Sequence, residues 1–385
     1  MSGPRALALT HVFPRFDGDP SAPFLLTWAR ALRDAGADLG VVAPHDAGLP
    51  GRRDVGGVPV RFVRYTPRRL ERLERLAYRG EMHQIAVRPV GPPLVASLVM
   101  TLAAAVRGQL RSGRPDVLHV HWWLPGAVAA RLARPGAPVV VTVHGTDVAL
   151  VESRPRLAAV ARWALAAADR VEAVSSDLAA RLERATGRAA DAVNPMPLPL
   201  DRLRPPERRP RPDHAPLRVL AVGRMVPEKG FADLIAAVAL LRTPALLTIV
   251  GDGPERGRLA AQARATGVPL DLPGRLDAAG LQAAYAASDV VVQPSAREGL
   301  GLVAAEALVL GLPVVATDSG GVRDLLDDLV PPGDARALAD RIAAVAHDPE
   351  GARAAVAPLA ARARERLSPA AAADRTLAGW AAASS

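Results

Sequence analysis

The sequence predicts an α/β protein with two open, doubly wound parallel sheets. Three observations support this fold class. Short apolar runs alternate with helical stretches along the chain, which is the order expected of parallel sheets. A segment dense in Pro and Arg at 194–216 interrupts the alternation once, and the alternation then restarts. The 385 residues are also enough for two domains of ordinary size, each with its own core.

The first half supplies one amphipathic helix and a series of buried strands. The helix, at 24–36, is ended by Gly36. The apolar run at 93–106 is too short to span a bilayer and is interpreted as a core helix. The strands are predicted at 6–12, 38–44, 116–122, 138–145 and 170–176.

The second half repeats this organisation after the Pro-rich segment. We expect a first domain at 1–200, a linker at 201–216 and a second domain at 217–367. The C-terminal helix, 368–385, is expected to pack back on the first domain. Ligands of open parallel sheets bind beyond the carboxyl ends of the strands, here facing a cleft between the domains. The strands of the second sheet are predicted at 217–223, 245–251, 269–274, 289–295 and 313–318.

Composition excludes several classes of site. There is no cysteine, so disulfides, thiolate nucleophiles and Cys-ligated metal centres are excluded. The N-terminal residues lack the apolar length and cleavage site of a signal peptide. We therefore expect a soluble, cytoplasmic protein, with peripheral contact at the inner face of the membrane as an extension of that prediction.

The positive charge is concentrated in the first half. Residues 1–200 carry 26 Arg against 17 acidic residues, a net charge of +9, whereas residues 201–385 carry 22 of each sign. This asymmetry indicates either an anionic partner or an Arg-rich solvated surface. The stretch 61–80 reads as a basic amphipathic helix with an apolar stripe, which could face an anionic membrane or simply the core. No nucleic-acid recognition motif is present.

Lys229 is the only lysine in the chain. It lies with Gly223 and Arg224 in the loop between the predicted strand 217–223 and the helix that begins near Gly230. Two cations at the carboxyl end of a strand and near a helix N-terminus can bind a dianion such as a diphosphate. An ordinary solvated loop is the alternative reading.

The next loop has a weak dinucleotide-like signature. Gly251, Gly253 and Gly257 imitate a glycine fingerprint but do not have its spacing. Pro254 also removes an N–H that a phosphate cradle would use. A tight turn that lets a ligand approach the backbone is the better interpretation.

Two glutamates flank a glycine-rich helix start. Glu298 follows the strand at 289–295, and Glu306 lies about one turn into a helix among Ala, Val and Leu. A carboxylate on an apolar helix needs a partner. Carboxylates on both sides of a phosphate site can accept hydrogen bonds from sugar and ribose hydroxyls.

These motifs, in this order, resemble the retaining glycosyltransferase family 4, whose members have the GT-B fold of two Rossmann-like domains. The resemblance rests on VGRMVPEKG, VGDGPER, PGRL, the E-x7-E pair within SAREGLGLVAAEAL, and GLPVVATDSGGVRDLL. It covers 217–332 densely. It covers the first half more thinly, through FPRFDGDPSAPFLLTWARALRDAG, VTVHGTD and AVSSDLAARL.

The resemblance implies an enzyme that moves a hexosyl group from a UDP- or GDP-linked sugar to a hydroxyl of a glycan or lipid-linked acceptor, with retention of configuration. The first domain would bind the acceptor and the second the nucleotide-sugar. Arg224 and Lys229 would bind the diphosphate beside Gly223, and Glu306 the ribose. Glu298 would bind the donor sugar. The implied neighbours of the donor are the backbone of Gly299, Leu300, Gly301 and Leu302 and the loop Gly274, Arg275 and Leu276.

The resemblance also implies roles in the first domain. His144 would lie near the transferred sugar, and the loop with Gly18 near the donor phosphate and the acceptor. Such families often have paired glycines there, whereas here Gly18 stands between Asp17 and Asp19. No cofactor and no bound metal are expected, because two cations could replace a divalent ion at the diphosphate. His119 and His121 share a strand face without an evident third ligand, so core or cleft histidines are expected there.

Two other functions remain open at the level of sequence. A dinucleotide-dependent oxidoreductase would use the glycine loop at 251–257. A non-catalytic nucleotide-sugar-binding protein would keep the fold without turnover, and the joint presence of Arg224, Lys229, Glu298 and Glu306 argues against it.

Overall fold

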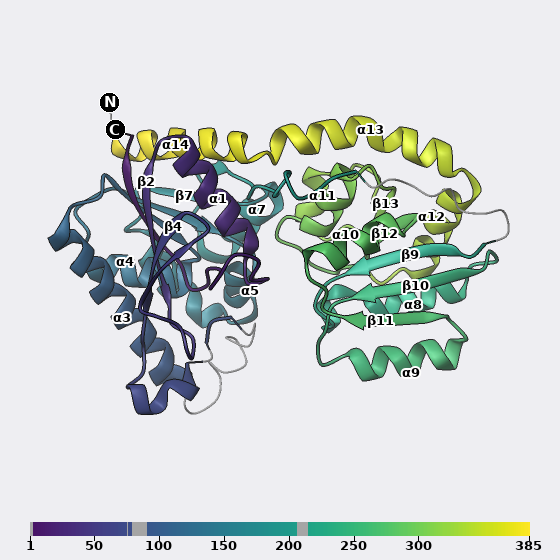
Figure 1. Ribbon diagram of the computed structural model, residues 1–385, viewed down its shortest axis with the longest axis horizontal. Coiled ribbons are helices and arrows are strands. Elements are labelled where there is room, and N and C mark those ends of the chain that lie inside the picture. The colour runs from purple at the N-terminus through teal and green to yellow at the C-terminus, as the bar shows by residue number, and fades with distance from the viewer. Residues whose placement is uncertain (1–2, 75, 79–90, 206–214) are drawn as a thin grey trace. The chain divides into compact units, whose positions relative to one another are not determined.

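The computed structural model describes residues 3–74, 76–78, 91–205 and 215–385, and it divides into two compact units (Figure 1). The first unit contains 1–197 together with 369–385, and the second contains 198–368. Helix α14 (Pro369–Ser384) therefore belongs to the first unit although it ends the chain. Most of the expected linker, at 206–214, lies outside the described residues.

The first unit contains an eight-stranded sheet in the order β3-β4-β2-β1-β5-β6-β7-β8. All neighbours are parallel except β3 and β4, which form an antiparallel hairpin. The predicted strands are confirmed, with β2 at the predicted residues. The bounds are β1 Arg5–Leu9, β2 Asp38–Pro44, β3 Arg52–Val55, β4 Val58–Val63, β5 Val117–His121, β6 Val139–Val143, β7 Arg170–Ala173 and β8 Ala192–Val193.

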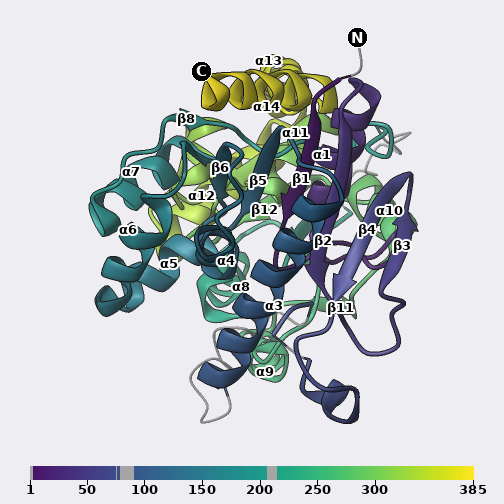
Figure 2. The same ribbon diagram turned by 90° about the vertical axis from the view of Figure 1, so that its left-hand side faces the viewer.

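Helices cover both faces of this sheet, because its strands are added on both sides of β1 with crossovers of one hand. Helix α1 packs against α14, and the Trp28 indole N–H donates to Thr376 Oγ1 of α14 at 3.1 Å. Figure 2 shows α3 and α4 side by side, in agreement with their extensive contact. The bounds are α1 Pro23–Asp34, α3 Gly91–Ser112, α4 Val128–Ala133, α5 Thr146–Ser153, α6 Ala158–Leu165 and α7 Ser176–Thr186.

Helix α3 corrects one expectation about length. The apolar run at 93–106 was expected to be too short to cross a bilayer, yet the helix continues to Ser112. Among the described residues, α3 is the helix that is long and apolar enough to span a membrane. Core helices of soluble proteins can have the same length and composition. Its buried face, which includes Leu98, Leu102 and Val106, packs against α4 and β2.

The Arg-rich stretch at 61–80 is not a continuous amphipathic helix. It begins as the end of β4 and then forms the short 3₁₀ helix η1 (Arg68–Leu73). Leu76 and Ala77 are buried, so this part of the expected stripe faces the core. Arg68, Arg69 and Arg72 are exposed, while Arg75 and 79–80 lie outside the described residues. The helix prediction failed because Val60, Phe62 and Val63 pair with β2 in the sheet.

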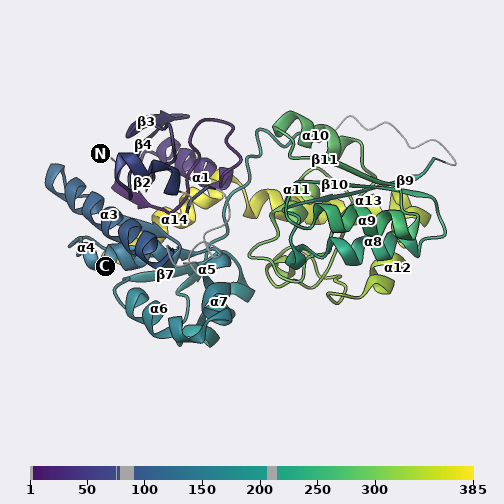
Figure 3. The same cartoon turned by 90° about the horizontal axis from the view of Figure 1, so that it is seen from below.

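The second unit contains a five-stranded parallel sheet in the order β11-β10-β9-β12-β13. Figure 3 shows α8 and α9 side by side. The strands are β9 Leu217–Val222, β10 Ala245–Val250, β11 Leu270–Gly274, β12 Val290–Gln293 and β13 Val314–Ala316. The helices are α8 Phe231–Ala239, α9 Arg256–Thr266, α10 Ala278–Ala286, α11 Leu302–Val309, α12 Ala335–His347 and α13 Pro349–Arg366.

Alternate residues of the central strands feed two separate cores. Val219 and Ala221 join the core with α8, α9 and α12, whereas Leu220 joins a smaller core that includes Tyr285 of α10. This period of two is expected of a sheet that is covered on both faces. The order reverses at β9, whose neighbours are β10 and β12, so the loops after β9 and β12 adjoin. Such a reversal is where open α/β sheets bind ligands.

Candidate active site

Lys229 and Glu298 meet where β9 and β12 end. Lys229 closes the short 3₁₀ helix η4 (Pro227–Lys229) after β9, and Glu298 follows β12. The Lys229 ammonium donates to Glu298 Oε1 at 2.6 Å, and the Ser295 hydroxyl donates to the same oxygen at 2.6 Å. The side chains of Lys229 and Glu298 are 28% and 14% exposed, so both remain within reach of a ligand. The two residues are 69 positions apart in the sequence, so no local sequence pattern could predict that they are in contact.

The backbone holds the Lys229 loop close to its neighbours. Gly230 has φ +65°, and a Cβ there would lie 1.9 Å from the carbonyl oxygen of Pro294. The Ala296 N–H also donates to the Glu228 carbonyl at 2.9 Å. Glycine at 230 therefore allows the two loops to approach each other. Arg224 is exposed at the start of the same loop, next to Gly223.

The glycines of the next loop serve loop packing. A Cβ at Gly251 would lie 1.9 Å from the Gly223 carbonyl oxygen, and one at Gly253 would lie 2.4 Å from that of Met225. The Met225 N–H donates to the Asp252 carbonyl at 2.9 Å. The loop needs glycine at these positions because another backbone segment lies against it. A dinucleotide-binding loop needs glycine for a different reason, to let a phosphate approach. The glycines therefore no longer support the oxidoreductase hypothesis.

The glycine-rich segment after Glu298 leads into helix α11. Gly301 has φ +85°, and a Cβ there would meet Val322 at 2.7 Å. Leu300 is buried. The Gln293 side chain accepts a hydrogen bond from the Ala304 N–H at 2.9 Å, so it caps one of the first amides of the helix. Gly299 and Leu302, at the two ends of the segment, are both partly exposed at this helix start.

Glu306 has a protein partner. The hydroxyl of the buried Tyr285 on α10 donates to Glu306 Oε2 at 2.7 Å. Burial raises the pKa of Glu306, and the hydrogen bond from Tyr285 partly offsets this. The partner that an acid on an apolar helix needs is thus supplied inside the fold, from 21 residues away. Oε1 is the carboxylate oxygen left for a ligand.

The loop after β11 contributes one exposed and one anchored residue. Gly274 ends β11 with φ +83°, and its carbonyl accepts from the Gly251 N–H at 2.8 Å. Arg275 is exposed. Leu276 packs against the smaller core beside the N-cap Asp277 of α10, so its side chain supports the loop.

In the first unit, His144 lies at the carboxyl end of β6. Its ring stacks on Trp122 with 4.1 Å between centroids, and its Nε2 lies 3.0 Å from Nδ1 of His121. Burial lowers the pKa of His144 well below its usual value, so the ring is neutral near pH 7. The Asp147 carboxylate accepts backbone N–H bonds from His144 and Gly145 and fixes this loop.

His119 and His121 form part of a packed aromatic cluster. The Trp380 indole N–H of α14 donates to His119 Nδ1 at 2.8 Å. Because Nδ1 accepts, the proton of the neutral ring is on Nε2, which donates to Thr142 Oγ1 at 2.8 Å. His119 is therefore a satisfied core histidine, as expected. His121 Nε2 and the neighbouring His11 Nδ1 are buried without a protein partner in the described structure.

The Gly18 loop after β1 is fixed by ion pairs. Arg15 contacts Asp19 at 2.6 Å and Asp46 at 2.6 Å, and Arg30 contacts Asp17 at 3.0 Å. The two aspartates that flank Gly18 are thus paired with arginines. Gly18 is exposed with φ +91°, and a Cβ would meet nothing within 4 Å. Its positive φ is the reason for glycine here.

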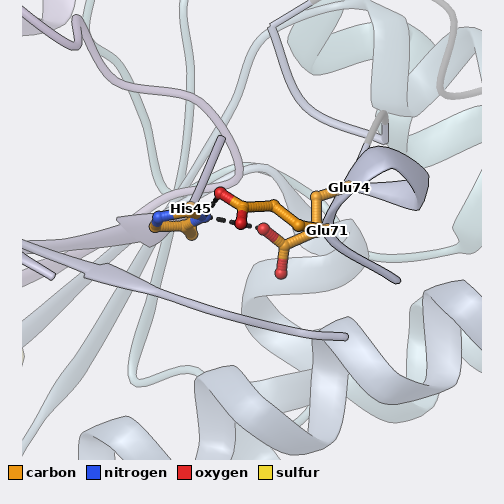
Figure 4. Close-up of side chains that lie close together, drawn as sticks. All are labelled: His45, Glu71 and Glu74. Atoms are coloured by element: carbon orange, nitrogen blue, oxygen red, sulfur yellow. Dashed lines mark hydrogen bonds and ion pairs between the residues drawn. The ribbon is translucent and has the colours of Figure 1, made fainter. Parts of the chain in front are cut away.

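His45, Glu71 and Glu74 lie close enough together to hold a metal ion (Figure 4). Each already has protein partners. His45 Nε2 lies 2.7 Å from the Leu49 carbonyl and Nδ1 lies 2.6 Å from Glu74. The other oxygen of Glu74 accepts the N–H groups of Tyr65 and Thr66. Since all three side chains already have protein partners, the cluster is best described as a structural hydrogen-bonded cluster that anchors η1 to the end of β2.

Comparisons with known proteins agree with the motifs and the fold. Residues 22–202 match the family profile described as Glycosyltransferase Family 4, and residues 207–365 match Glycosyl transferases group 1. The chain is 33% identical over 354 residues to 2-deoxystreptamine N-acetyl-D-glucosaminyltransferase of Streptomyces fradiae, which covers 82% of this chain and 79% of that protein. A teichuronic acid biosynthesis glycosyltransferase of Bacillus subtilis is 29% identical and covers 89% and 90%.

Solved structures share the fold. A sucrose-phosphate synthase from Thermosynechococcus elongatus superposes with a TM-score of 0.78 at 23% identity, covering 97% of both chains. An Anabaena protein, HepE, solved in complex with UDP-glucose, superposes at 0.70 with 22% identity, covering 97% of this chain and 98% of that chain. On the family profiles, the relatives and the two parallel-sheet units, this chain belongs to glycosyltransferase family 4 and has the GT-B fold.

Proposed function

We propose that this glycosyltransferase moves a hexosyl group from a UDP- or GDP-linked sugar to a hydroxyl of a glycan or lipid-linked acceptor, with retention of anomeric configuration. The observation that carries the donor assignment is the Lys229–Glu298 contact of 2.6 Å where β9 and β12 end. This contact places a cation beside a carboxylate that can accept hydrogen bonds from sugar hydroxyls. Both lie at the point where the strand order of the parallel sheet reverses.

Each donor group then has a chemical counterpart. Arg224 and Lys229 neutralise the diphosphate and stabilise the charge that develops on the departing nucleotide. Glu298 accepts hydrogen bonds from hydroxyls of the donor sugar, and Glu306 Oε1 accepts from the ribose. The start of α11 adds backbone N–H groups for phosphate oxygens. Because two side chains supply the positive charge, the proposal needs no bound metal.

The transfer itself is a displacement at the anomeric carbon. The acceptor hydroxyl attacks on the face from which the diphosphate leaves, so the new C–O bond replaces the old one with the same configuration. A phosphate oxygen of the leaving group takes the hydroxyl proton. His144 contributes a neutral imidazole that hydrogen-bonds a sugar hydroxyl.

The relatives support the donor class and leave the acceptor broad. HepE was solved with UDP-glucose, and a starch synthase with the same fold was solved with ADP and acarbose. One relative is named for transfer to 2-deoxystreptamine, and another is named for teichuronic acid biosynthesis. These names suggest a carbohydrate or cyclitol hydroxyl as acceptor.

A thermal-shift screen with UDP, GDP and ADP tests the donor site. The matching nucleotide should stabilise the protein, and Lys229→Ala should weaken its binding by about 10- to 100-fold, the value of a charge-assisted hydrogen bond. Arg336→Ala, which removes an exposed ion pair with Asp340 on α12, is the matched control and should bind normally. Unchanged affinity in Lys229→Ala would refute the diphosphate assignment, and an inverted product anomer would refute retention.

A further inference from the structure

A cavity lies at the edge of the first sheet opposite to His144. It has a volume of about 720 Å³, which is in the range of small-molecule sites. Val139, the first residue of β6, and Asp169, which directly precedes β7, line it, so it opens at the amino ends of these strands. The rest of its lining comes from α3, the end of α4, the segment 134–137 that leads from α4 to β6, and α6 with the turn after it.

Three arginines without a carboxylate partner line this cavity. Arg107 lies on α3, Arg131 on α4, and Arg134 ends α4. None of them forms an ion pair within the described residues, in contrast to Arg15 and Arg181 of the same unit. Arg107 donates to the carbonyl of Leu132, which also lines the cavity. Three arginines that line one cavity without a carboxylate to neutralise them favour a ligand with negative charge.

An exposed indole lies in the same cavity. Trp163 on α6 is 41% exposed, whereas the four other tryptophans are at most 6% exposed. The Arg131 guanidinium lies over its ring at 4.6 Å. Aromatic rings provide apolar faces with a specific geometry, and the C–H faces of a sugar ring can pack on such a surface. The Asp169 carboxylate, which accepts the Val139 N–H through Oδ2, adds an acceptor for a hydroxyl.

Arg134 occupies a backbone conformation that favours glycine. It has φ 52° and ψ 67° at the C-cap of α4. A side chain other than glycine, asparagine or aspartate is uncommon there and carries a strain cost. An exposed arginine that lines the cavity despite this backbone cost is more consistent with a ligand site than with local stability.

We propose that this cavity binds an anionic sugar, a hexose ring carrying a carboxylate or phosphate, and holds an acidic glycan outside the donor site. Three observations support this: the three arginines have no carboxylate partner, the indole is exposed, and the concave shape suits a discrete ligand better than a flat surface does. The identification of the ligand with the acceptor glycan rests on the proposed function, but binding to the cavity does not depend on it.

Trp163 provides the measurement. Because the other tryptophans are buried, collisional quenching by acrylamide reports almost only on Trp163, and Trp163→Phe should remove the quenchable fraction. Tri-galacturonic acid and glucose 6-phosphate are the probes. Either should reduce the quenching constant by about twofold or more, whereas neutral maltotriose should not. Equal protection by inorganic phosphate, or stronger protection by UMP, would overturn the assignment to a sugar.

Arg134→Gly separates binding from folding. Glycine suits the backbone at this position, so the variant should keep or raise the melting temperature while it weakens probe binding by about tenfold. Arg184→Ala, at an exposed arginine of α7 outside the cavity lining, is the matched control and should bind normally. Normal binding by Arg134→Gly would refute the site. Lys229→Ala should also bind the probe normally, so a failure of the donor assignment would leave this test intact.

Discussion

Lys229 and Glu298 neutralise each other when no donor is bound. The pair is partly exposed, and such pairs contribute about 0–1 kcal/mol. In the proposed donor site, a diphosphate would therefore compete with Glu298 for the ammonium at modest cost. Donor binding would redirect Lys229 to phosphate and leave the Glu298 carboxylate for sugar hydroxyls. The contact seen in the structure is thus consistent with a site that is ready to exchange one partner for another.

This competition predicts opposite effects of Glu298→Gln on two measurements. The amide removes the charge that holds Lys229, so the free nucleoside diphosphate should bind equally well or up to about fivefold more tightly. Turnover should fall, because the sugar hydroxyls lose a charged acceptor. Calorimetric titration and steady-state kinetics measure the two quantities. Nucleotide binding that is tenfold weaker in Glu298→Gln would contradict the competition.

Glu306 shows why a residue's role needs its neighbours. Its position among apolar residues indicated that the carboxylate needs a hydrogen-bond partner. The Tyr285 hydroxyl is the partner of one of its two oxygens. The deduction that the acid needs a partner was sound, and the identity of that partner depended on how α10 and α11 pack together. Ser295, three residues before Glu298 and bonded to it, was likewise missed, since serine in a loop carries no distinctive signal.

Helix α14 carries a link from the end of the chain to the histidine cluster. The hydrogen bond from Trp380 determines which ring nitrogen of His119 carries the proton. The His119 ring stacks on His121, which in turn contacts His144. Secondary-structure elements far apart in the sequence thus share one buried polar network in the first unit. In such networks an unpaired member is costly.

Removing that link should destabilise the first unit. Trp380→Phe leaves His119 Nδ1 buried without a donor, which costs about 1–3 kcal/mol. Urea denaturation followed by tryptophan fluorescence measures the loss, because all five tryptophans of the chain lie in the first unit. Trp163→Phe, at the exposed tryptophan, is the control and should change stability little. Equal stability of the two variants would show that the bond to His119 contributes nothing.

Strand prediction succeeded in position and failed at the ends. β2 occupies the expected residues, but β12 stops at Gln293 although the apolar run was read to 295. The strand ends before Pro294, which has no N–H to donate to a neighbouring strand, and the carbonyl of this residue lies against Gly230. The expected helix at 61–80 failed for a related reason, since strand pairing with β2 outweighed the local helical pattern.

Viewed as a whole, the first unit buries several neutral histidines. Burial lowers the pKa of His119 to about 3 and that of His11 to about 4, and it holds the pKa values of His121 and His144 well below the usual value of a histidine. The unfolded chain binds a proton at each of these groups below about pH 6.5. Between that pH and the folded pKa the unfolded state holds more protons, so acid favours unfolding.

The contribution of these histidines to the free energy of unfolding of the first unit should therefore be greatest above about pH 6.5 and should fall as the pH decreases toward 4. Each histidine contributes a slope of about 1.4 kcal/mol per pH unit. Urea denaturation at a series of pH values measures this slope through tryptophan fluorescence. His119→Asn keeps an acceptor for the Trp380 N–H but has no group that titrates in this pH range. The variant should therefore lose the contribution of one histidine to the slope. A flat profile in the natural protein would contradict the neutral cluster.

The sequence by itself determined the alternation of strands and helices, the two sheets, the family and the candidate residues on the loops after β9 and β12. These follow from periodicity and from short motifs, which are local properties of the chain. Only the tertiary structure decided that Lys229 pairs with Glu298, that Tyr285 pairs with Glu306, and that Trp380 bonds to His119. Such partners lie 21 to 261 residues apart, and they meet because parallel strands bring distant loops to one edge and helices pack by shape. No local pattern encodes that choice of partner.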